Sequence, residues 1–372
     1  MAAEFRNTAD TYTAGARTLP QRYLTSPEIF AAEQQRIFAA RWVCAAHVHE
    51  LAEPGAFVLR EVAGESLILV RGADGGVHCH YNVCRHRGSR MCERESGRFT
   101  GAIRCPYHSW TYELDGRLRA APHMDGVPGF DHAGIALRSA QVGIWEGLVF
   151  VNVGREPTPF ESAFAPLLGK FARWNLPLLR AARRIDYDVA ANWKLLFENF
   201  SECYHCPGVH PALAKLTPYN KAENDLSEGP FLGGFMPIRS GGSITTSGNA
   251  CALPLGALDA EEQGRVYYYS NFPNLLLSLH PDYAMVHTLW PRAPAQTTVR
   301  CEWLFHPDAF GRADFRPDDA VGFCDVTNRQ DWHVCELNQQ GVASRAYEPG
   351  PYSPRESIAA AFDREYLRAM CD

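Results

Sequence analysis

Two short cysteine–histidine pairs constrain this chain more than any other feature. Cys84 and His86 form a Cys-x-His pair, and Cys105 and His108 form a Cys-x-x-His pair, with 18 residues between the two pairs. Structural zinc accepts two thiolates and two imidazoles, but its usual spacings pair Cys with Cys and His with His. Here each pair supplies one residue of each type. This arrangement favours a two-iron, two-sulfide cluster in which one iron takes both thiolates and the other takes both imidazoles.

The sequence around these pairs is typical of β-structure. Between residues 50 and 155, short apolar runs alternate with glycine-rich turns, which predicts a series of short strands. Helical patterns flank this region, and a second group of strands precedes a long helix near the end. These further elements are expected at residues 26–46, 160–175, 190–206, 265–306 and 317–343. We therefore expect an α+β fold, with an all-β domain inserted into a domain that both chain ends form.

A second set of metal-binding side chains lies in residues 192–211. Glu202 and His205 are three residues apart on a predicted helix, so they share one face. His210 follows five residues later, and a proline–glycine pair between the histidines breaks the helix, which lets both imidazoles converge. Two histidines and one carboxylate, with open positions opposite, form the site that non-haem iron(II) uses to bind dioxygen.

The third ligand of such a site is expected to be a carboxylate from the predicted helix at 317–343. Asp331 shares a mostly inward face with residues such as Val334 and Cys335. Glu336 shares a charged, solvated face, whereas Asp325 is an alternative because apolar residues surround it. The helical pattern favours Asp331.

Together these motifs resemble the large (alpha) subunit of the Rieske-type non-haem iron oxygenases. The resemblance rests on CRHRGSRMC, CPYHSWTYELDGRL and ECYHCPGVHP, and on an Asp followed by a Glu and a Gln-x-Gly in a late helix. It implies one Rieske [2Fe-2S] cluster and one mononuclear Fe(II). The cluster ligands would be Cys84, His86, Cys105 and His108, and the iron ligands would be His205, His210 and Asp331.

The resemblance also assigns the residues next to the iron ligands. Glu202 would not bind iron but would lie between it and the Rieske histidine of a neighbouring subunit, where it passes electrons or protons. Many members of the family have Asp at this position. Cys203 and Cys206 flank His205, and we interpret them as packing residues rather than redox thiols.

The same family defines the expected domains and assembly. A helical segment would span residues 1–40, the Rieske domain 41–155, and a catalytic helix-grip domain 156–372, with an antiparallel sheet and a long C-terminal helix. Members form ring-like trimers, so we expect a homotrimer. No dinucleotide-binding glycine motif is present, so NAD(P)H and flavin are expected only on a separate reductase.

The expected reaction is the oxidation of a C–H bond with dioxygen as co-substrate. The family divides between aromatic-ring dioxygenases and monooxygenases of quaternary amines. ECYHCPGVHP and AYEPGPYSPRE resemble the betaine, choline and carnitine group, which predicts N-demethylation with release of formaldehyde. An aromatic-ring dioxygenase alpha subunit is the alternative, and a Rieske electron-transfer protein without oxygenase activity is an alternative of another class.

Aromatic residues in the strand-rich stretch at 265–291 suggest how an ammonium group would be held. Tyr267, Tyr269 and Trp290 are candidates because a cation binds over the faces of aromatic rings. The competing interpretation is that these side chains belong to the core, where aromatic residues of strands are usually found.

Charge and cysteine content indicate which classes of partner and which cellular compartment to expect. The net charge is -6, from 36 basic and 42 acidic residues, and no basic block occurs, which argues against nucleic acid and membrane surfaces. No apolar run approaches the roughly 20 residues of a membrane span. The chain has 12 cysteines and no secretory signal at its start, so we expect reduced thiols and a cytoplasmic protein.

Overall fold

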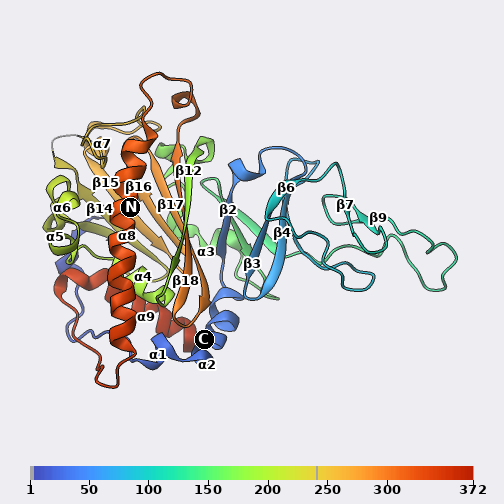
Figure 1. The fold of residues 1–372 in the computed structure, drawn as a ribbon, viewed down its shortest axis with the longest axis horizontal. Helices are drawn as coiled ribbons and strands as arrows, with labels where there is room; N and C mark the ends of the chain where they lie inside the picture. Colours follow the sequence, from blue (N-terminus) through green and yellow to red (C-terminus); the bar gives the residue numbers. More distant parts are fainter. Residues whose placement is uncertain (1–3, 240–241, 372) are drawn as a thin grey trace. The chain divides into compact units, whose positions relative to one another are not determined.

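The computed structural model describes residues 4–239 and 242–371, and it divides the chain into two compact units. The inserted unit is Phe38–Ala165. The terminal unit combines Met1–Ile37 with Pro166–Asp372, so both ends of the chain build it (Figure 1). The expected α+β fold with an inserted β-rich domain is therefore confirmed.

The inserted unit consists mainly of short strands. Its elements are β2 (Val43–His47), η3 (Val48–Leu51), β3 (Ala56–Val62), β4 (Glu65–Arg71), β5 (Val77–Tyr81), β6 (Ser96–Arg98), β7 (Ile103–Arg104), β8 (Thr111–Tyr112), β9 (Leu118–Ala120), β10 (Gln141–Trp145), β11 (Leu148–Asn152) and α3 (Phe160–Ala163). They form three antiparallel sheets with the orders β10-β11-β2, β5-β4-β3-β6 and β7-β8-β9. One apolar cluster, which includes Phe57, Trp110 and Tyr112, packs beneath the loops that follow β5 and β7.

The terminal unit is built on one antiparallel sheet. Its strands are β1 (Arg6–Asn7), β12 (Arg180–Val189), β13 (Glu223–Leu226), β14 (Phe231–Pro237), β15 (Arg265–Asn271), β16 (Leu275–Leu279), β17 (Ala284–Ala293) and β18 (Gln296–Phe305). The order in the sheet is β1-β13-β14-β15-β16-β17-β18-β12, so most neighbours in sequence are neighbours in space. Such a meander buries one face of the sheet against helices.

The helices of the terminal unit are mostly short. They are α1 (Arg22–Thr25), α2 (Pro27–Glu33), α4 (Trp193–Phe200), α5 (Cys206–Val209), α6 (Pro211–Leu216), α7 (Ala260–Gln263), α8 (Pro317–Val342) and α9 (Ser357–Cys371). The short 3₁₀ segments are η1 (Thr8–Thr11), η4 (Ala165–Leu167), η5 (Ala172–Trp174), η6 (Leu176–Leu178), η7 (Tyr219–Lys221), η9 (Pro307–Ala309) and η10 (Pro354–Glu356).

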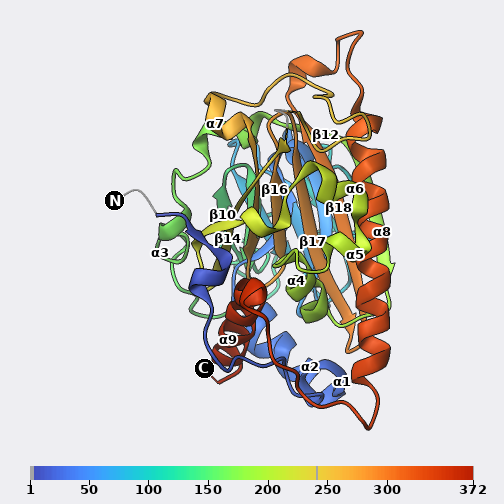
Figure 2. The same cartoon turned by 90° about the vertical axis from the view of Figure 1, so that its left-hand side faces the viewer.

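The long helix α8 is the main cover of the sheet. It packs against β12 and α4 and lies along the sheet in Figure 2. Pro317 suits the start of the helix because the first backbone N–H groups have no partner within the helix and proline has no N–H. The acidic residues of the first turn interact favourably with the positive end of the helix dipole. The expected helix-grip architecture, a sheet held by a long C-terminal helix, is present.

Two expected helices are shorter than the sequence predicted. The helix expected over 26–46 ends as α2 at Glu33 and continues only as the π-helical turn η2 (Gln34–Phe38), whereas Val43–His47 is strand β2. All five residues of that strand are buried, so tertiary pairing with β11 overrides the helical pattern. The helix expected over 160–175 breaks into α3 and 3₁₀ turns at Pro166, whose ring cannot continue a helix.

The boundary between the units also differs from the expected one. Residues 156–165 were expected in the catalytic domain but belong to the inserted unit. Trp42 Nε1 donates a hydrogen bond to the Thr158 carbonyl at 2.9 Å. The Phe160 ring lies 4.9 Å from that of Trp42 and stacks on Phe164, which ties this segment to the core of the inserted unit.

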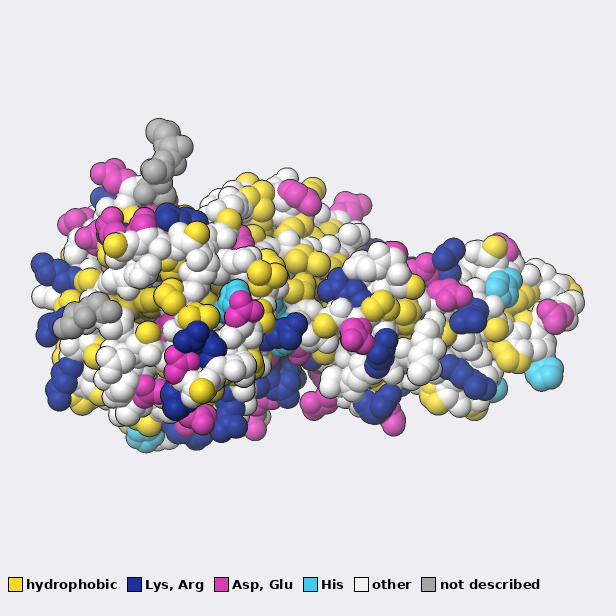
Figure 3. Space-filling view, turned by 90° about the horizontal axis from the view of Figure 1, so that it is seen from above, with side chains coloured by type: hydrophobic (Ala, Val, Ile, Leu, Met, Phe, Trp, Pro, Cys, Tyr) yellow, Lys and Arg dark blue, Asp and Glu magenta, His cyan; other side chains and the backbone are white. Residues whose placement is uncertain are grey.

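On the face shown in Figure 3, basic and acidic side chains are interspersed. None of the helices in residues 4–239 and 242–371 combines the length and the apolar character needed to cross a membrane.

A cluster of buried ionisable groups lies beneath α4. Lys194 Nζ pairs with Glu33 Oε1 at 2.5 Å, and both side chains are fully buried. Next to them, burial and then the charge of Asp363 raise the pKa of Glu198 well above its ordinary value. Burial also raises the pKa of Asp363 to about 7, although its Oδ2 accepts a hydrogen bond from Tyr352 at 2.7 Å.

We predict that this carboxyl pair makes folding stability depend on pH. Both groups bind a proton more tightly in the folded than in the unfolded chain, so the free energy of unfolding falls as pH rises from about 4 to about 7. Glu198→Gln removes one such group. Its free energy of unfolding relative to that of wild type, measured by denaturant unfolding, should become more favourable between about pH 5 and about pH 8, by on the order of 2 kcal/mol.

The matched control is Glu228→Gln, at an exposed residue of the same unit. Its stability difference from wild type should not change with pH. Parallel curves for Glu198→Gln and wild type across this range would contradict the prediction.

Candidate metal centres

The two candidate iron-binding histidines lie at the two ends of α5: His205 ends the turn after α4, and His210 joins α5 to α6. α4 ends at Phe200, where the Ser201 hydroxyl and backbone N–H both bond to the Phe197 carbonyl. The helix expected over 190–206 is therefore interrupted, and Glu202 and His205 do not share one helical face as predicted. They meet in the turn instead, because the Glu202 carboxylate accepts from the backbone N–H of both Tyr204 and His205.

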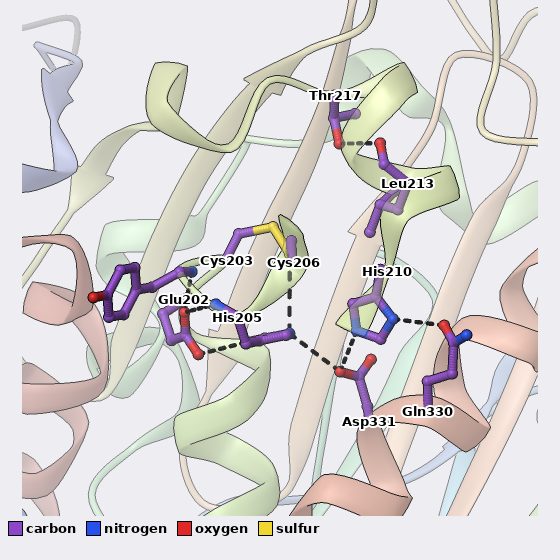
Figure 4. Close-up of a disulfide and its surroundings, with 10 residues drawn as sticks. Glu202, Cys203, His205, Cys206, His210, Leu213, Thr217, Gln330 and Asp331 are labelled. Carbon is purple, nitrogen blue, oxygen red and sulfur yellow. Dashed lines mark hydrogen bonds and ion pairs between the residues drawn. A yellow bond between two sulfur atoms is a disulfide. The ribbon is translucent and has the colours of Figure 1, made fainter. Parts of the chain in front are cut away.

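His205, His210 and Asp331 converge on one point (Figure 4). Their ligand atoms all lie within 4.8 Å of one another. Asp331 Oδ1 lies 2.7 Å from His210 Nε2 and 3.2 Å from His205 Nε2. The turn after α4 thus supplies one imidazole and the junction of α5 and α6 the other. The middle of α8 supplies the carboxylate from more than a hundred residues away in sequence.

The outer nitrogens of both imidazoles are held by acceptors. His205 Nδ1 lies 2.5 Å from Glu202 Oε1, and His210 Nδ1 lies 2.8 Å from Gln330 Oε1. Because these oxygens only accept, each Nδ1 carries a proton, which leaves each Nε2 lone pair directed toward Asp331. A ring held through one nitrogen and facing a metal with the other is the arrangement found in protein metal sites. The three residues therefore fit a divalent ion.

The electrostatics of the group also suit a cation. Burial lowers the pKa of His205, but hydrogen bonds to Asp331 and Glu202 outweigh it and raise that pKa to about 10. Burial likewise raises the pKa of Asp331, yet the two histidines bring it below its ordinary value. The carboxylates of Glu202 and Asp331 thus stabilise positive charge at the imidazoles. A divalent metal ion would supply that positive charge in place of the protons that the rings otherwise bind.

The other candidate carboxylates of α8 lie elsewhere. Asp325 accepts a hydrogen bond from the Tyr187 hydroxyl at 2.7 Å and pairs with Arg329 at 3.0 Å. Glu336 Oε1 accepts from the Ala190 backbone N–H at 3.1 Å. Both therefore tie α8 to β12 and the residues that follow it. Neither belongs to the three-residue group.

Cys203 and Cys206 form a disulfide, which corrects the interpretation of both as packing thiols. Their Cα atoms lie 5.0 Å apart across the turn that contains His205. The other ten cysteines, all within the described residues, form no disulfide, and all of them except Cys371 are buried.

The two cysteine–histidine pairs sit in loops at one end of the inserted unit. Cys84 and His86 follow β5, whereas Cys105 and His108 follow β7. Each loop is closed by its own cysteine: the Cys84 carbonyl accepts from the Gly88 N–H at 3.0 Å, and the Cys105 carbonyl accepts from the Ser109 N–H at 3.1 Å. Gly88 has φ +72°, which residues with a side chain rarely adopt.

The pairs differ in exposure in a way that suits a cluster. Both thiols belong to the apolar core of the unit, and the Cys84 sulfur lies 3.3 Å from the Tyr112 hydroxyl. His86 is exposed, and its ring centroid lies 4.7 Å from that of the partly buried His108. The thiols therefore face inward, and the imidazoles face outward.

This geometry does not suit a single zinc ion. Zinc would bring four donors to within about 4 Å of one another. Among the described residues, the one group of three donors placed to share a single ion is His205, His210 and Asp331, and it includes none of these four. Separate thiol and imidazole pairs fit the two irons of a [2Fe-2S] cluster, in which bridging sulfides hold the metals apart.

A cavity of about 140 Å³ adjoins the three-residue group. His205, His210 and Asp331 line it, and the sheet supplies its opposite wall through β14–β17. Much of the remaining lining is apolar or aromatic, including Phe200, Phe235, Tyr268, Phe323 and Trp332.

The expected aromatic contacts lie on the wrong side of the sheet. Tyr267 packs on Trp174, and Tyr269 packs on Phe171, both away from the cavity. Trp290 lies further along β17 and bonds to Thr288 through Nε1, and it is also absent from the described lining. Because side chains alternate along a strand, the residue that reaches the cavity is Tyr268.

Sequence reasoning also missed Gln330. This residue orients His210, and its only signal was its position next to Asp331. Two further histidines of the cavity, His280 and His287, had no signal because they stand singly in strand-rich sequence.

Comparisons with known proteins agree with both centres. Residues 41–131 match the family described as Rieske [2Fe-2S] domain, and residues 177–372 match the ring hydroxylating alpha subunit (catalytic domain). The chain belongs to the Rieske oxygenases and is an oxygenase alpha subunit. It is therefore an oxidoreductase with a Rieske domain and a non-haem iron domain.

Particular relatives refine this class. The glycine betaine monooxygenase oxygenase subunit of Chromohalobacter salexigens is 32% identical over 91% of this chain and 82% of its own length. The carnitine monooxygenase oxygenase subunit of Acinetobacter baumannii is 37% identical over 89% of this chain and 87% of its own. The crystal structure of the quaternary ammonium Rieske monooxygenase CntA with L-carnitine has a TM-score of 0.77 and 25% identity, and covers 98% of this chain and 97% of the other.

We predict that the Cys203–Cys206 disulfide stabilises the turn that carries His205. Cys203→Ser should lower the mononuclear iron content and the activity by about two- to tenfold, because the turn gains conformational freedom. Absorbance of the cluster should not change. The control is Cys371→Ser, at the exposed free cysteine.

Thiol counting tests the disulfide itself. Denatured, metal-free protein should show ten reactive thiols before reduction and twelve after it. Twelve thiols before reduction would show that the bond is absent from the isolated protein.

Proposed function

We propose that this chain is the oxygenase component of a monooxygenase that removes an N-methyl group from a quaternary amine. One observation carries the proposal: the His205, His210 and Asp331 group opens onto a cavity with an aromatic lining. Cations bind over aromatic faces, and relatives of this chain are named for glycine betaine and carnitine.

The ligand roles belong to this proposal. Cys84, His86, Cys105 and His108 would hold the [2Fe-2S] cluster, and His205, His210 and Asp331 would hold the Fe(II). When bound, the cluster delivers single electrons, and the iron activates dioxygen. The residues of the chain orient these groups, bind the amine and exclude water.

Glu202 and Gln330 would act as positioning residues for the two imidazoles. Each holds an Nδ1 proton, so that both Nε2 atoms keep their direction. Glu202 is also our candidate for the bridge toward the cluster of a neighbouring subunit, because its carboxylate is only partly buried and contacts a proposed ligand directly.

The cavity would hold the amine with its ammonium over the rings of Phe200, Tyr268 and Trp332. Arg355 is the one Lys or Arg in the described lining, so it is the candidate partner for a substrate carboxylate. Hydroxylation of an N-methyl carbon replaces one C–H bond with C–OH. The other oxygen atom of O2 leaves as water, with two electrons from the reductase and two protons. The hemiaminal hydroxyl then loses its proton as the C–N bond breaks, which gives a tertiary amine, formaldehyde and H⁺.

The partners and the compartment are part of the same proposal. A separate flavin and iron–sulfur reductase would take electrons from NAD(P)H, and three copies of the chain would assemble so that one copy's cluster serves its neighbour's iron. We also propose a cytoplasmic location. A solved relative is described by its inter-subunit electron transfer, which supports this assembly by similarity of fold.

The proposed reaction is tested with purified protein, a Rieske oxygenase reductase and NADH. With candidate betaines, carnitine or choline, the mixture should consume one dioxygen for each formaldehyde released. With naphthalene or benzoate, neither change should occur. Dihydrodiol formation from an aromatic substrate without formaldehyde would instead support a ring dioxygenase.

Asp331→Asn should impair the mononuclear iron site and leave the [2Fe-2S] cluster unchanged. We expect at least an about 100-fold loss of formaldehyde formation, because the neutral amide binds Fe(II) poorly. The EPR signal of the reduced cluster should keep its intensity. Asp325→Asn is the matched control on the same helix and should retain activity; equal losses in both variants would contradict the assignment.

Glu202→Gln tests the bridge and positioning role. We expect about a tenfold to 100-fold lower turnover, since the amide keeps the size of the side chain but loses its charge. Reduction of the cluster by the reductase should proceed at the wild-type rate. If turnover were unchanged, Glu202 would be neither a bridge nor a positioning residue.

A further inference from the structure

One wall of the cavity carries three buried polar side chains with no use in the chemistry described so far. They are Ser278, His280 and His287, with exposed fractions of 0%, 1% and 1%. Ser278 Oγ and both ring nitrogens of His280 have no hydrogen-bond partner among the described residues. The His287 ring nitrogens also lack one by distance and angle, although the Asn328 side chain is near enough to raise the pKa of that ring. All three line the cavity beside the candidate iron site.

The register of the sheet explains why these residues face the cavity. Ser278 on β16 pairs with Tyr268 on β15 and with Met285 on β17, and all three of these residues line the cavity. His287 lies two residues beyond Met285 and so shares its face. His280 follows β16 with the same parity, and its ring stacks on Tyr283 at 3.9 Å, which holds its orientation.

Leaving these groups buried and unpaired is costly. A buried donor or acceptor without a partner costs about 1–3 kcal/mol, so native interiors rarely contain several together. Apolar residues would fill the same positions without this cost. Water in the cavity can supply these hydrogen bonds, and a ligand that displaces this water has to supply them in its place.

The charge state of the wall limits the kind of ligand group. Burial lowers the pKa of His280 to about 3 and that of His287 to about 4, so both rings are neutral near pH 7. A neutral imidazole offers one donor and one acceptor. This matches a hydroxyl, which donates and accepts, better than a carboxylate, whose burial against uncharged groups is unfavourable.

The position of His287 limits where that hydroxyl can be. The ring contacts Phe200 and Trp332, at centroid distances of 6.3 Å and 6.1 Å, and both of these rings line the cavity. His287 also lies close enough to Asp331 for that charge to influence its pKa. His287 therefore lies in the part of the cavity that adjoins Asp331.

We propose that Ser278, His280 and His287 form a hydroxyl-binding wall that selects quaternary amines with a hydroxyl a few bonds from the ammonium group. This inference rests on the proposed N-demethylase function and adds the substrate feature that the cavity selects. Glycine betaine lacks such a hydroxyl and leaves the wall unpaired.

The test uses two substrates that differ only in this group. L-Carnitine carries the hydroxyl, and γ-butyrobetaine is the same molecule without it. For the wild-type protein, kcat/KM measured by formaldehyde release should be at least about tenfold higher for L-carnitine, because the deoxy substrate leaves the wall unsatisfied. Equal values, or a preference for γ-butyrobetaine, would overturn the proposal.

Variants of the wall residues test whether these residues cause the preference for L-carnitine. His287→Phe and Ser278→Ala should lower kcat/KM for L-carnitine toward the value for γ-butyrobetaine and leave the latter nearly unchanged. Calorimetric binding of both amines should show the same loss of discrimination. Met285→Leu, on the same wall without a hydrogen-bonding change, is the matched control and should keep the preference.

Two further outcomes are distinguishable. If the variants lower kcat/KM equally for both substrates, the wall does not read the hydroxyl and the inference is wrong. If no quaternary amine releases formaldehyde from the wild-type protein, the proposed function itself fails. Ser278→Ala removes a single oxygen atom, so it keeps the test valid where the larger His287→Phe change impairs folding.

Discussion

The candidate iron site depends on one arrangement of hydrogen bonds, in which each imidazole is held through its outer nitrogen. Glu202 fixes His205, Gln330 fixes His210, and both rings then face Asp331. Three separate pieces of chain must be in register for this to occur: the end of α4, the start of α6 and the middle of α8. The packing of α8 against α4 and β12 supplies that register.

Polar groups are used in opposite ways on the two sides of the cavity. Beside α8 they are paired and charged, which favours a cation and a fixed coordination geometry. On the sheet side they are neutral and unpaired, which favours a ligand with hydrogen-bonding groups. The aromatic rings between the two sides suit an ammonium group, so the cavity as a whole matches a small molecule with a cationic and a polar part.

The Rieske loops follow a related design within the inserted unit. Their cysteines lie in the apolar core, where burial protects sulfur from solvent, and His86 is exposed. The imidazole side of the proposed cluster would therefore be its exposed side. The disulfide next to His205 adds a covalent constraint to the second centre.

Much of the architecture could be predicted from the sequence. Strand alternation and glycine turns indicated the inserted β domain, and the pattern at 317–343 indicated α8 to within a residue. Errors arose where tertiary contacts override a local pattern. Val43–His47 is a strand because β11 pairs with it, and residues 156–165 join the inserted unit because Phe160 packs on Trp42.

The sequence by itself determined the chemistry that is available: two cysteine–histidine pairs, two histidines around a Pro-Gly break, and one inward carboxylate on a late helix. These follow from residue type and spacing, which are local properties. Only the tertiary structure decided which tyrosine reaches the cavity, that Cys203 and Cys206 are joined, and that Ser278, His280 and His287 share a wall. The physical reason is that the face of a strand and the path of a turn are set by contacts between residues that are distant in sequence.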